Sequence, residues 1–194
     1  MKTLVAEDVV EELRTGGDEA VRLYVAACAE RMAPLFIGLR AGEAARETDV
    51  DLYVAAVGDL WKTDRPLSDS ADRLHSLDRF PELQLAEDGI TETIDTYVFF
   101  ACLVLRHALR AGSSGNADQA ISCGHAVLTA MGMLDQNIVG AVFKTDEQRL
   151  QSLSASGSAA GLWDASVAAG RERLRAVLSR VARETLETAA QLAN

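Results

Sequence analysis

Cysteine, proline and aromatic residues are scarce in this chain, and their scarcity excludes several classes of protein. The 194 residues include three Cys and three Pro, and aromatic side chains make up 5% of them. Three cysteines are too few for a disulfide framework, and their odd number favours free thiols in a reducing compartment. Few aromatic and proline residues, with many alanines and leucines, favour helices over strands. We therefore expect a cytoplasmic, mostly helical protein.

Long apolar runs are also missing. The uncharged stretch from Thr96 to Leu105 is much shorter than the roughly 18–20 apolar residues that a membrane span needs. Residues 1–8 carry one Lys and soon turn acidic, so we expect no signal peptide, and we expect no membrane partner. With 48% apolar and 25% charged residues the composition is that of a globular protein. The length suits a single domain over residues 1–194.

Charge is unevenly distributed along the chain, whose formal net charge is −10. Residues 1–100 contain 21 acidic and 10 basic side chains, whereas residues 101–194 contain 8 and 9. The acidic front half disfavours nucleic acid and suits a basic protein partner. The arginines of residues 171–183 spread around their helix without interleaved aromatic residues, so nucleic-acid binding is not expected there either. Solubility alone is the competing explanation of the acidity.

Apolar residues recur at intervals of three and four through most of the chain, which is the spacing of a buried helical face. The most apolar segment, about residues 89–111, has Asp88 as its expected N-cap and Gly112 as its expected end. We place it at the centre of an all-α, single-domain bundle of seven to eight helices. In the last helix, residues 161–193, the expected buried stripe consists of Leu174, Val177, Leu178, Val181 and Leu186.

Two capping-box patterns mark the starts of further helices. Asn116 with Gln119 follows a short Ser/Gly link, which predicts a helix antiparallel to the central one. Thr145 with Gln148 is the second pattern and predicts the start of another helix.

Three charged residues interrupt apolar helices, namely Glu30, Arg31 and Asp95. A buried carboxylate needs a partner, so we expect Asp95 to pair with Arg31 across a helix–helix contact. Two interpretations are open. The cluster either is a structural ion pair that fixes the register of two helices, or it places two carboxylates around one arginine for acid–base chemistry or ligand binding. Most buried ion pairs are structural, which favours the first interpretation.

Motifs for metal, cofactor or covalent chemistry are missing. No H-x-x-x-H, C-x-x-C or H-E-x-x-H spacing occurs, so we expect no metal site and no cofactor. No G-x-S-x-G motif is present, and the cysteines lie in apolar surroundings that raise a thiol pKa, so no catalytic residue is predicted. Trp61 and Trp163 are either packing anchors or walls of a pocket, and packing is the commoner role.

Three segments together resemble the motifs of a known family. The first is the run AACAERMAP, from Ala26 to Pro34, and the second is Leu60–Trp61. The third is Ile94–Asp95, followed by Ala101, Leu105 and residues 120–122. In their order and spacing they resemble the bacterial YjaG-like all-helical family (domain of unknown function 416), over residues 23–133.

That resemblance implies a compact helical bundle and no established substrate, cofactor or catalytic set. It marks Glu30, Arg31 and Asp95 as positions that match the family pattern. Around Trp163 the chain departs from the pattern, since Leu162 and residues 164–167 differ from it.

Three functions are compatible with these features. The one we expect is a non-enzymatic, cytoplasmic protein-binding or regulatory module, such as an immunity-type protein that neutralises a basic toxin. The alternative is a small-ligand binder or enzyme in which Glu30, Arg31 and Asp95 face a pocket. The third is a homo-oligomer that forms through the last helix or another apolar face.

Overall fold

The computed structural model describes residues 3–67, 69–84, 90, 92–157 and 161–192. Within these residues it is 82% helical with no strands, which confirms the all-α prediction. The α-helices, in chain order, are α1 (Glu7–Thr15), α2 (Gly17–Arg40), α3 (Glu47–Leu60), α4 (Ser70–Leu77), α5 (Pro81–Gln84), α6 (Thr93–Ser114), α7 (Ala117–Asn137), α8 (Phe143–Ala155) and α9 (Leu162–Leu192). A 3₁₀ turn at Ala44–Arg46 precedes α3.

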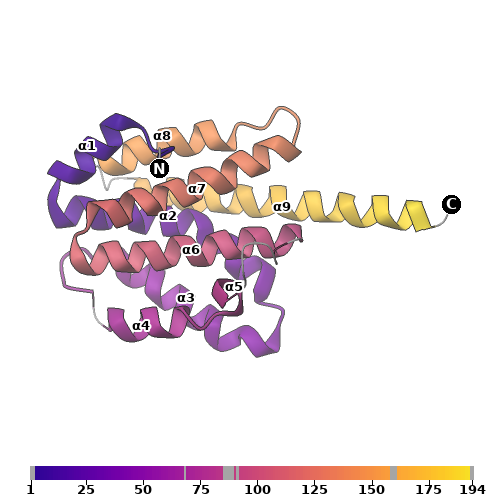
Figure 1. Ribbon diagram of the computed structural model, residues 1–194, viewed down its shortest axis with the longest axis horizontal. Helices are drawn as coiled ribbons and strands as arrows, with labels where there is room; N and C mark the ends of the chain where they lie inside the picture. The colour runs from indigo at the N-terminus through magenta and orange to yellow at the C-terminus, as the bar shows by residue number, and fades with distance from the viewer. Residues whose placement is uncertain (1–2, 68, 85–89, 91, 158–160, 193–194) are drawn as a thin grey trace.

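Two long helices form the middle of the bundle. The expected central helix corresponds to α6, and α2 packs along it more extensively than any other pair of helices in the described parts of the chain. Figure 1 shows α1, α7 and α8 on one side of this pair and α3, α4 and α5 on the other. The core is therefore one large cluster of apolar side chains to which α2, α6 and α7 contribute most, with a small second cluster of Leu23, Ala27 and Leu162.

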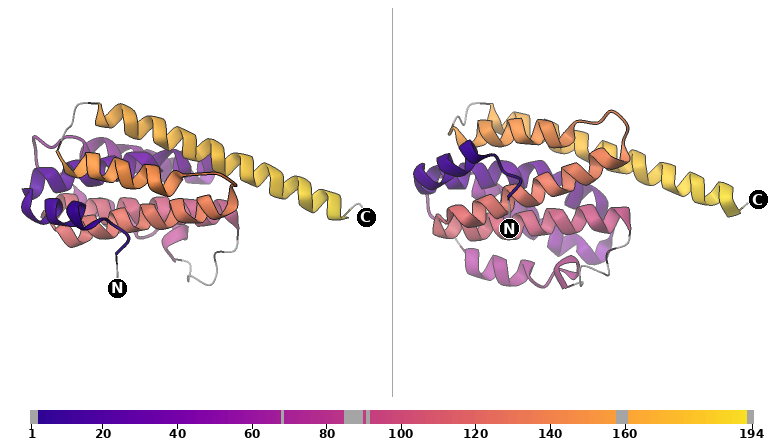
Figure 2. Two further views of the ribbon diagram at one scale, coloured as in Figure 1. Left: turned by 90° about the horizontal axis from the view of Figure 1, so that it is seen from above. Right: turned by 45° about the horizontal axis from the view of Figure 1, so that its top comes forward.

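The last helix extends well beyond the rest of the molecule. Figures 1 and 2 show the C-terminal part of α9 projecting past the ends of the other helices. Its predicted buried stripe is therefore only partly correct. Val177 is buried and Leu174 and Val181 are partly buried, but Leu178 is 45% exposed and Leu186 is 70% exposed. No described helix is long and apolar enough to cross a membrane.

The ends of the central helix differ from those expected. The helix begins at Thr93, and Asp88, its expected N-cap, lies outside the described residues. It continues through Gly112, which was expected to end it, and stops at Ser114 before Gly115. Gly115 has φ +65°, a left-handed conformation that glycine adopts without steric cost. The turn to α7 is therefore shorter than the sequence suggested.

One of the two predicted helix caps is present. Asn116 Oδ1 accepts a hydrogen bond from the Gln119 N–H at 3.1 Å, as the first capping-box pattern predicts. The second prediction was wrong, because α8 begins two residues before Thr145. Asp135, from the preceding helix, accepts hydrogen bonds there from the backbone N–H groups of Phe143 (2.8 Å) and Lys144 (3.0 Å). A capping-box pattern spans four residues, so it cannot predict a cap supplied from further away along the chain.

Candidate functional site

The predicted pair of Arg31 and Asp95 does not form. Asp95 instead lies at the start of α6, where its Oδ1 is 2.6 Å from Nη2 of Arg40. Its side chain is 38% exposed, so Asp95 is not the buried carboxylate that the sequence suggested. Arg31, in contrast, is fully buried and needs a different partner.

That partner is Glu147 of α8. Nε and Nη2 of Arg31 donate to the two carboxylate oxygens of Glu147, each at 2.9 Å, which makes a bidentate ion pair. Both side chains are completely buried. Nη1 of Arg31 is 3.3 Å from both Ser154 Oγ and Ser166 Oγ. A guanidinium group with every edge occupied is the arrangement that makes a buried charge tolerable.

A second arginine shares the same carboxylate. Nη2 of Arg173, on α9, is 2.5 Å from Oε2 of Glu147. Gln151 Nε2 donates to Oε1 of Glu147 at 2.8 Å, and the Tyr24 hydroxyl donates to Oε1 of Gln151 at 2.9 Å. Burial by itself raises the pKa of Glu147, but the two arginines outweigh it and hold this pKa below its ordinary value. The cluster ties α2, α8 and α9 together and is sealed from solvent.

Glu30 and Trp61 bond to one another at the edge of the core. Nε1 of Trp61 donates to Oε2 of Glu30 at 3.0 Å. Burial raises the pKa of Glu30 and exceeds the opposite effect of this hydrogen bond. Trp163 is 53% exposed, and neither tryptophan lines either of the two grooves described below. The structure therefore separates Glu30, Arg31 and Asp95 into three different environments.

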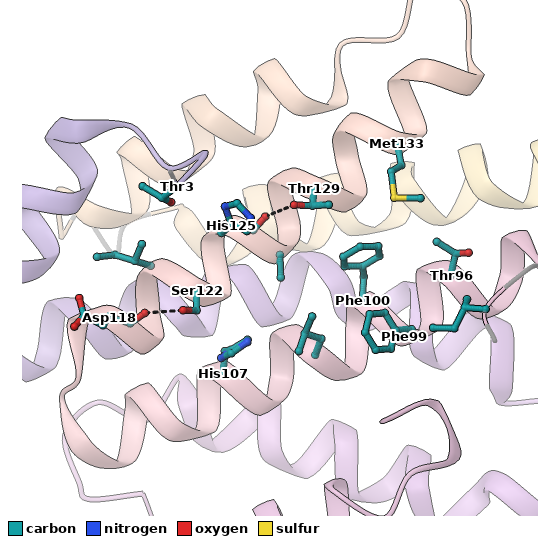
Figure 3. A pocket seen from close by; sticks show the side chains of 14 residues that line it. Thr3, Thr96, Phe99, Phe100, His107, Asp118, Ser122, His125, Thr129 and Met133 are labelled. Carbon is teal, nitrogen blue, oxygen red and sulfur yellow. Dashed lines mark hydrogen bonds between the residues drawn. The ribbon is translucent and has the colours of Figure 1, made fainter. Parts of the chain in front are cut away.

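A groove with a volume of about 780 Å³ lies between α6 and α7. Its apolar surface comes chiefly from Ile90, Phe99, Phe100, Leu103, Ile121, Ala126 and Met133, and its polar groups belong to Thr3, Thr96, His107, Asp118, Ser122, His125 and Thr129. Figure 3 shows Asp118 at one end of the groove and Phe99, Phe100 and Met133 toward the other. A second groove, between the start of α6 and the C-terminal half of α9, is lined by a larger share of polar residues, among them Arg180 and Glu184.

The two histidines of the α6–α7 groove are fixed by hydrogen bonds. Nδ1 of His107 is 3.0 Å from Oε1 of Gln119, and burial lowers the pKa of His107 below its ordinary value. The backbone N–H of Leu4 donates to Nδ1 of His125 at 3.1 Å, so this nitrogen is an acceptor. His107 is thus an uncharged, polar group of the groove at neutral pH.

Two hydroxyl groups of the groove donate to carbonyls of their own helix. Ser122 Oγ donates to the carbonyl of Asp118, and Thr129 Oγ1 donates to the carbonyl of His125, each at 2.9 Å. Hydroxyls committed in this way are acceptors for a ligand and are not activated nucleophiles. Among the described groove residues, the arrangement therefore suits binding rather than bond-making.

Beside the Asp118 end of the groove lies an acidic face. It consists of the exposed carboxylates of α1 and the first turn of α2, namely Glu7, Asp8, Glu11, Glu12, Asp18 and Glu19. Arg14 is the one cation in this segment, residues 7–19, and its Nη2 lies 3.6 Å from Oδ1 of Asp118 on the groove rim. We call these six residues the acidic α1 face.

No protein-family model, curated protein or solved structure matches this chain. The resemblance to the YjaG-like family therefore stays a prediction, and functional inference rests on the geometry described above.

Proposed function

We propose that the protein is a non-enzymatic binding module whose partner is a basic protein. The acidic α1 face carries this proposal. Within the described residues its carboxylates form no ion pair, whereas other acids of the front half, such as Asp59 and Glu82, are each paired with arginines. The acidic α1 face thus gathers six unpaired carboxylates within residues 7–19, and their charge is available to another molecule.

Local helix energetics account for only part of this face. Glu7 and Asp8 lie in the first turn of α1, where the helix dipole favours negative charge. Glu11 and Glu12 follow four residues after them, and like charges at this spacing repel by a few tenths of a kcal/mol per pair. A helix selected for stability alone would place lysine or arginine at these two positions. Their acidity is consistent with recognition of positive charge, as in a regulator or an immunity-type protein that neutralises a basic toxin.

The test is an affinity capture from lysate that compares three forms of the immobilised protein. In the first variant Glu7, Glu11 and Glu12 become Gln. In the matched control, Glu47, Asp51 and Asp72 become the corresponding amides, because these acids are also exposed, form no ion pair among the described residues and lie away from α1. We expect basic proteins to be retained by the wild type and the control, released by moderate salt, and lost from the α1 variant. Equal recovery by all three forms would contradict the proposal.

A second candidate, self-association, is supported by the projecting part of α9. Leu178 and Leu186 are both exposed on this helix, and its C-terminal part extends past the bundle (Figure 2). An isolated helical arm gains little stability without a neighbour to cover its apolar side. A second copy of the chain is one such neighbour.

A further inference from the structure

The α6–α7 groove follows most of the length of α7. From Asp118 to Met133 it follows 15 residues of α7, which corresponds to roughly 22 Å at 1.5 Å per residue. A partner helix of about four turns therefore matches the groove in length.

The two ends of the groove differ in polarity. At one end Asp118 is the single acidic side chain among the described lining residues, and it contacts Arg14 of α1, the helix that carries four carboxylates of the acidic α1 face. Toward the other end Phe99 and Phe100 pack edge to face, with ring centroids 5.5 Å apart, next to the exposed side chain of Met133. Methionine and aromatic side chains are adaptable contacts for apolar residues of a partner.

We propose that this groove receives the apolar edge of a basic amphipathic helix from the partner protein. The inference rests on the proposed function and specifies the part of the partner that binds. Apolar residues at i, i+3 or i+4, i+7 and i+11 of that helix enter the groove, and its lysines or arginines lie against Asp118 and the acidic α1 face. Charge selects this occupant over a second copy of the chain, since another molecule of net charge −10 is repelled from the same rim.

The probe is a synthetic peptide of leucine and lysine with helical spacing, carrying a fluorescent label, and the readout is its anisotropy when titrated with the full-length protein. A peptide of the same composition in scrambled order has the charge without the apolar edge. Met133→Glu places a charge in the groove. Leu153→Glu on α8 is the matched control, because Met133 and Leu153 are 36% and 38% exposed and both variants add one negative charge. Circular dichroism checks that both variants keep their helices.

We expect the helical peptide to bind the wild type and Leu153→Glu within twofold of one another, and Met133→Glu at least tenfold more weakly. The extra negative charge of Met133→Glu by itself attracts a basic peptide. A loss of affinity in this variant would therefore come from the change inside the groove. Equal affinity of the two variants, equal affinity for the scrambled peptide, or no binding up to about 1 mM would each overturn the proposal.

The groove and the acidic α1 face are tested separately by the same assay. If neutralising Glu7, Glu11 and Glu12 weakens both peptides equally while Met133→Glu has no effect, the proposed function stands and the groove is not its site. If Met133→Glu releases the helical peptide and neutralisation does not, the groove is the binding site and the acidic α1 face is not needed.

Discussion

Glu147 is one carboxylate facing two guanidinium groups, in a place that solvent does not reach. Arg31 and Arg173 lose their hydration on folding, and Glu147 is the only acidic side chain in ion-pair contact with either of them in the described structure. Taking charges out of water is costly, and breaking a buried pair costs more than making it gains. The integrity of this contact therefore depends on the negative charge at one position.

Replacing Glu147 with Gln is expected to lower the free energy of unfolding by about 3–5 kcal/mol, because two arginines stay buried without a counter-charge. Urea denaturation followed by circular dichroism measures the change. Glu184→Gln is the control, since the Arg180–Glu184 pair lies near the surface and such pairs contribute about 1 kcal/mol or less. A loss for Glu147→Gln no larger than that of the control would show that the buried cluster is not a source of stability.

The sequence predicted that Arg31 needs a buried carboxylate, but it pointed to the wrong one. Asp95 stood out because it interrupts an apolar helix, yet it lies in the first turn of α6, where it reaches Arg40 near the surface. The sequence of α8 is mostly polar, so the burial of Glu147 was not predicted. Its signal was the stripe formed with Gln151 and Ser154, at i, i+4 and i+7, which places three polar groups on one buried face.

At the scale of elements, α2 and α9 approach one another closely where Pro34 meets Gly170. A Cβ on Gly170 would lie 2.9 Å from Cγ of Pro34 and 3.1 Å from the carbonyl oxygen of Arg31. The proline ring and the backbone carbonyl are both rigid, so neither group can move aside. The absence of a side chain at position 170 thus sets the distance between α2 and α9. These two helices also supply the two arginines that pair with Glu147.

Gly170→Ala is expected to destabilise the protein by about 1–3 kcal/mol through this overpacking. Gly58→Ala in α3 is the matched control, because a Cβ there meets nothing within 4 Å and alanine is the better helix former. That control should be unchanged or more stable by about 0.5–1 kcal/mol. Thermal unfolding of the two variants compares them directly, and a Gly170→Ala protein as stable as Gly58→Ala would contradict the close packing of α2 and α9.

Periodicity predicted the helices well and their ends poorly. The interiors follow from the three- and four-residue spacing of apolar side chains, which depends only on the local chain. The ends depend on distant groups, as Asp135 shows by capping the start of α8 across a loop. The burial of Leu178 and Leu186 in α9 was predicted wrongly for the same reason. Their spacing along the helix does not tell whether a neighbouring helix covers them. The α6–α7 groove was likewise beyond a local pattern, since it is a gap between two helices.

At the scale of the whole molecule, the projecting part of α9 and the net charge act in opposite directions. The exposed apolar side chains of α9 favour association, whereas a charge of −10 on each copy opposes it. Added salt weakens only the second effect. Any self-association through α9 should therefore strengthen as the ionic strength rises.

Light scattering during size-exclusion chromatography tests this expectation. We expect dimers at high protein concentration, a larger dimer fraction at higher salt, and monomers for Leu186→Glu under both conditions. Val54→Glu in α3 is the control, because Val54 is also more than half exposed and lies in the body of the bundle. A monomer at all concentrations and salt levels would remove self-association from the candidate functions.

The position of Glu147 also has a consequence for the order in which the protein is made. Arg31 leaves the ribosome more than a hundred residues before its carboxylate does, although α2 belongs to the middle of the core. A nascent chain that ends before α8 would have to bury Arg31 without a counter-charge or leave α2 in contact with water. The helices that precede α8 therefore cannot reach their final packing early. The fold is completed only when the last quarter of the chain has been synthesised.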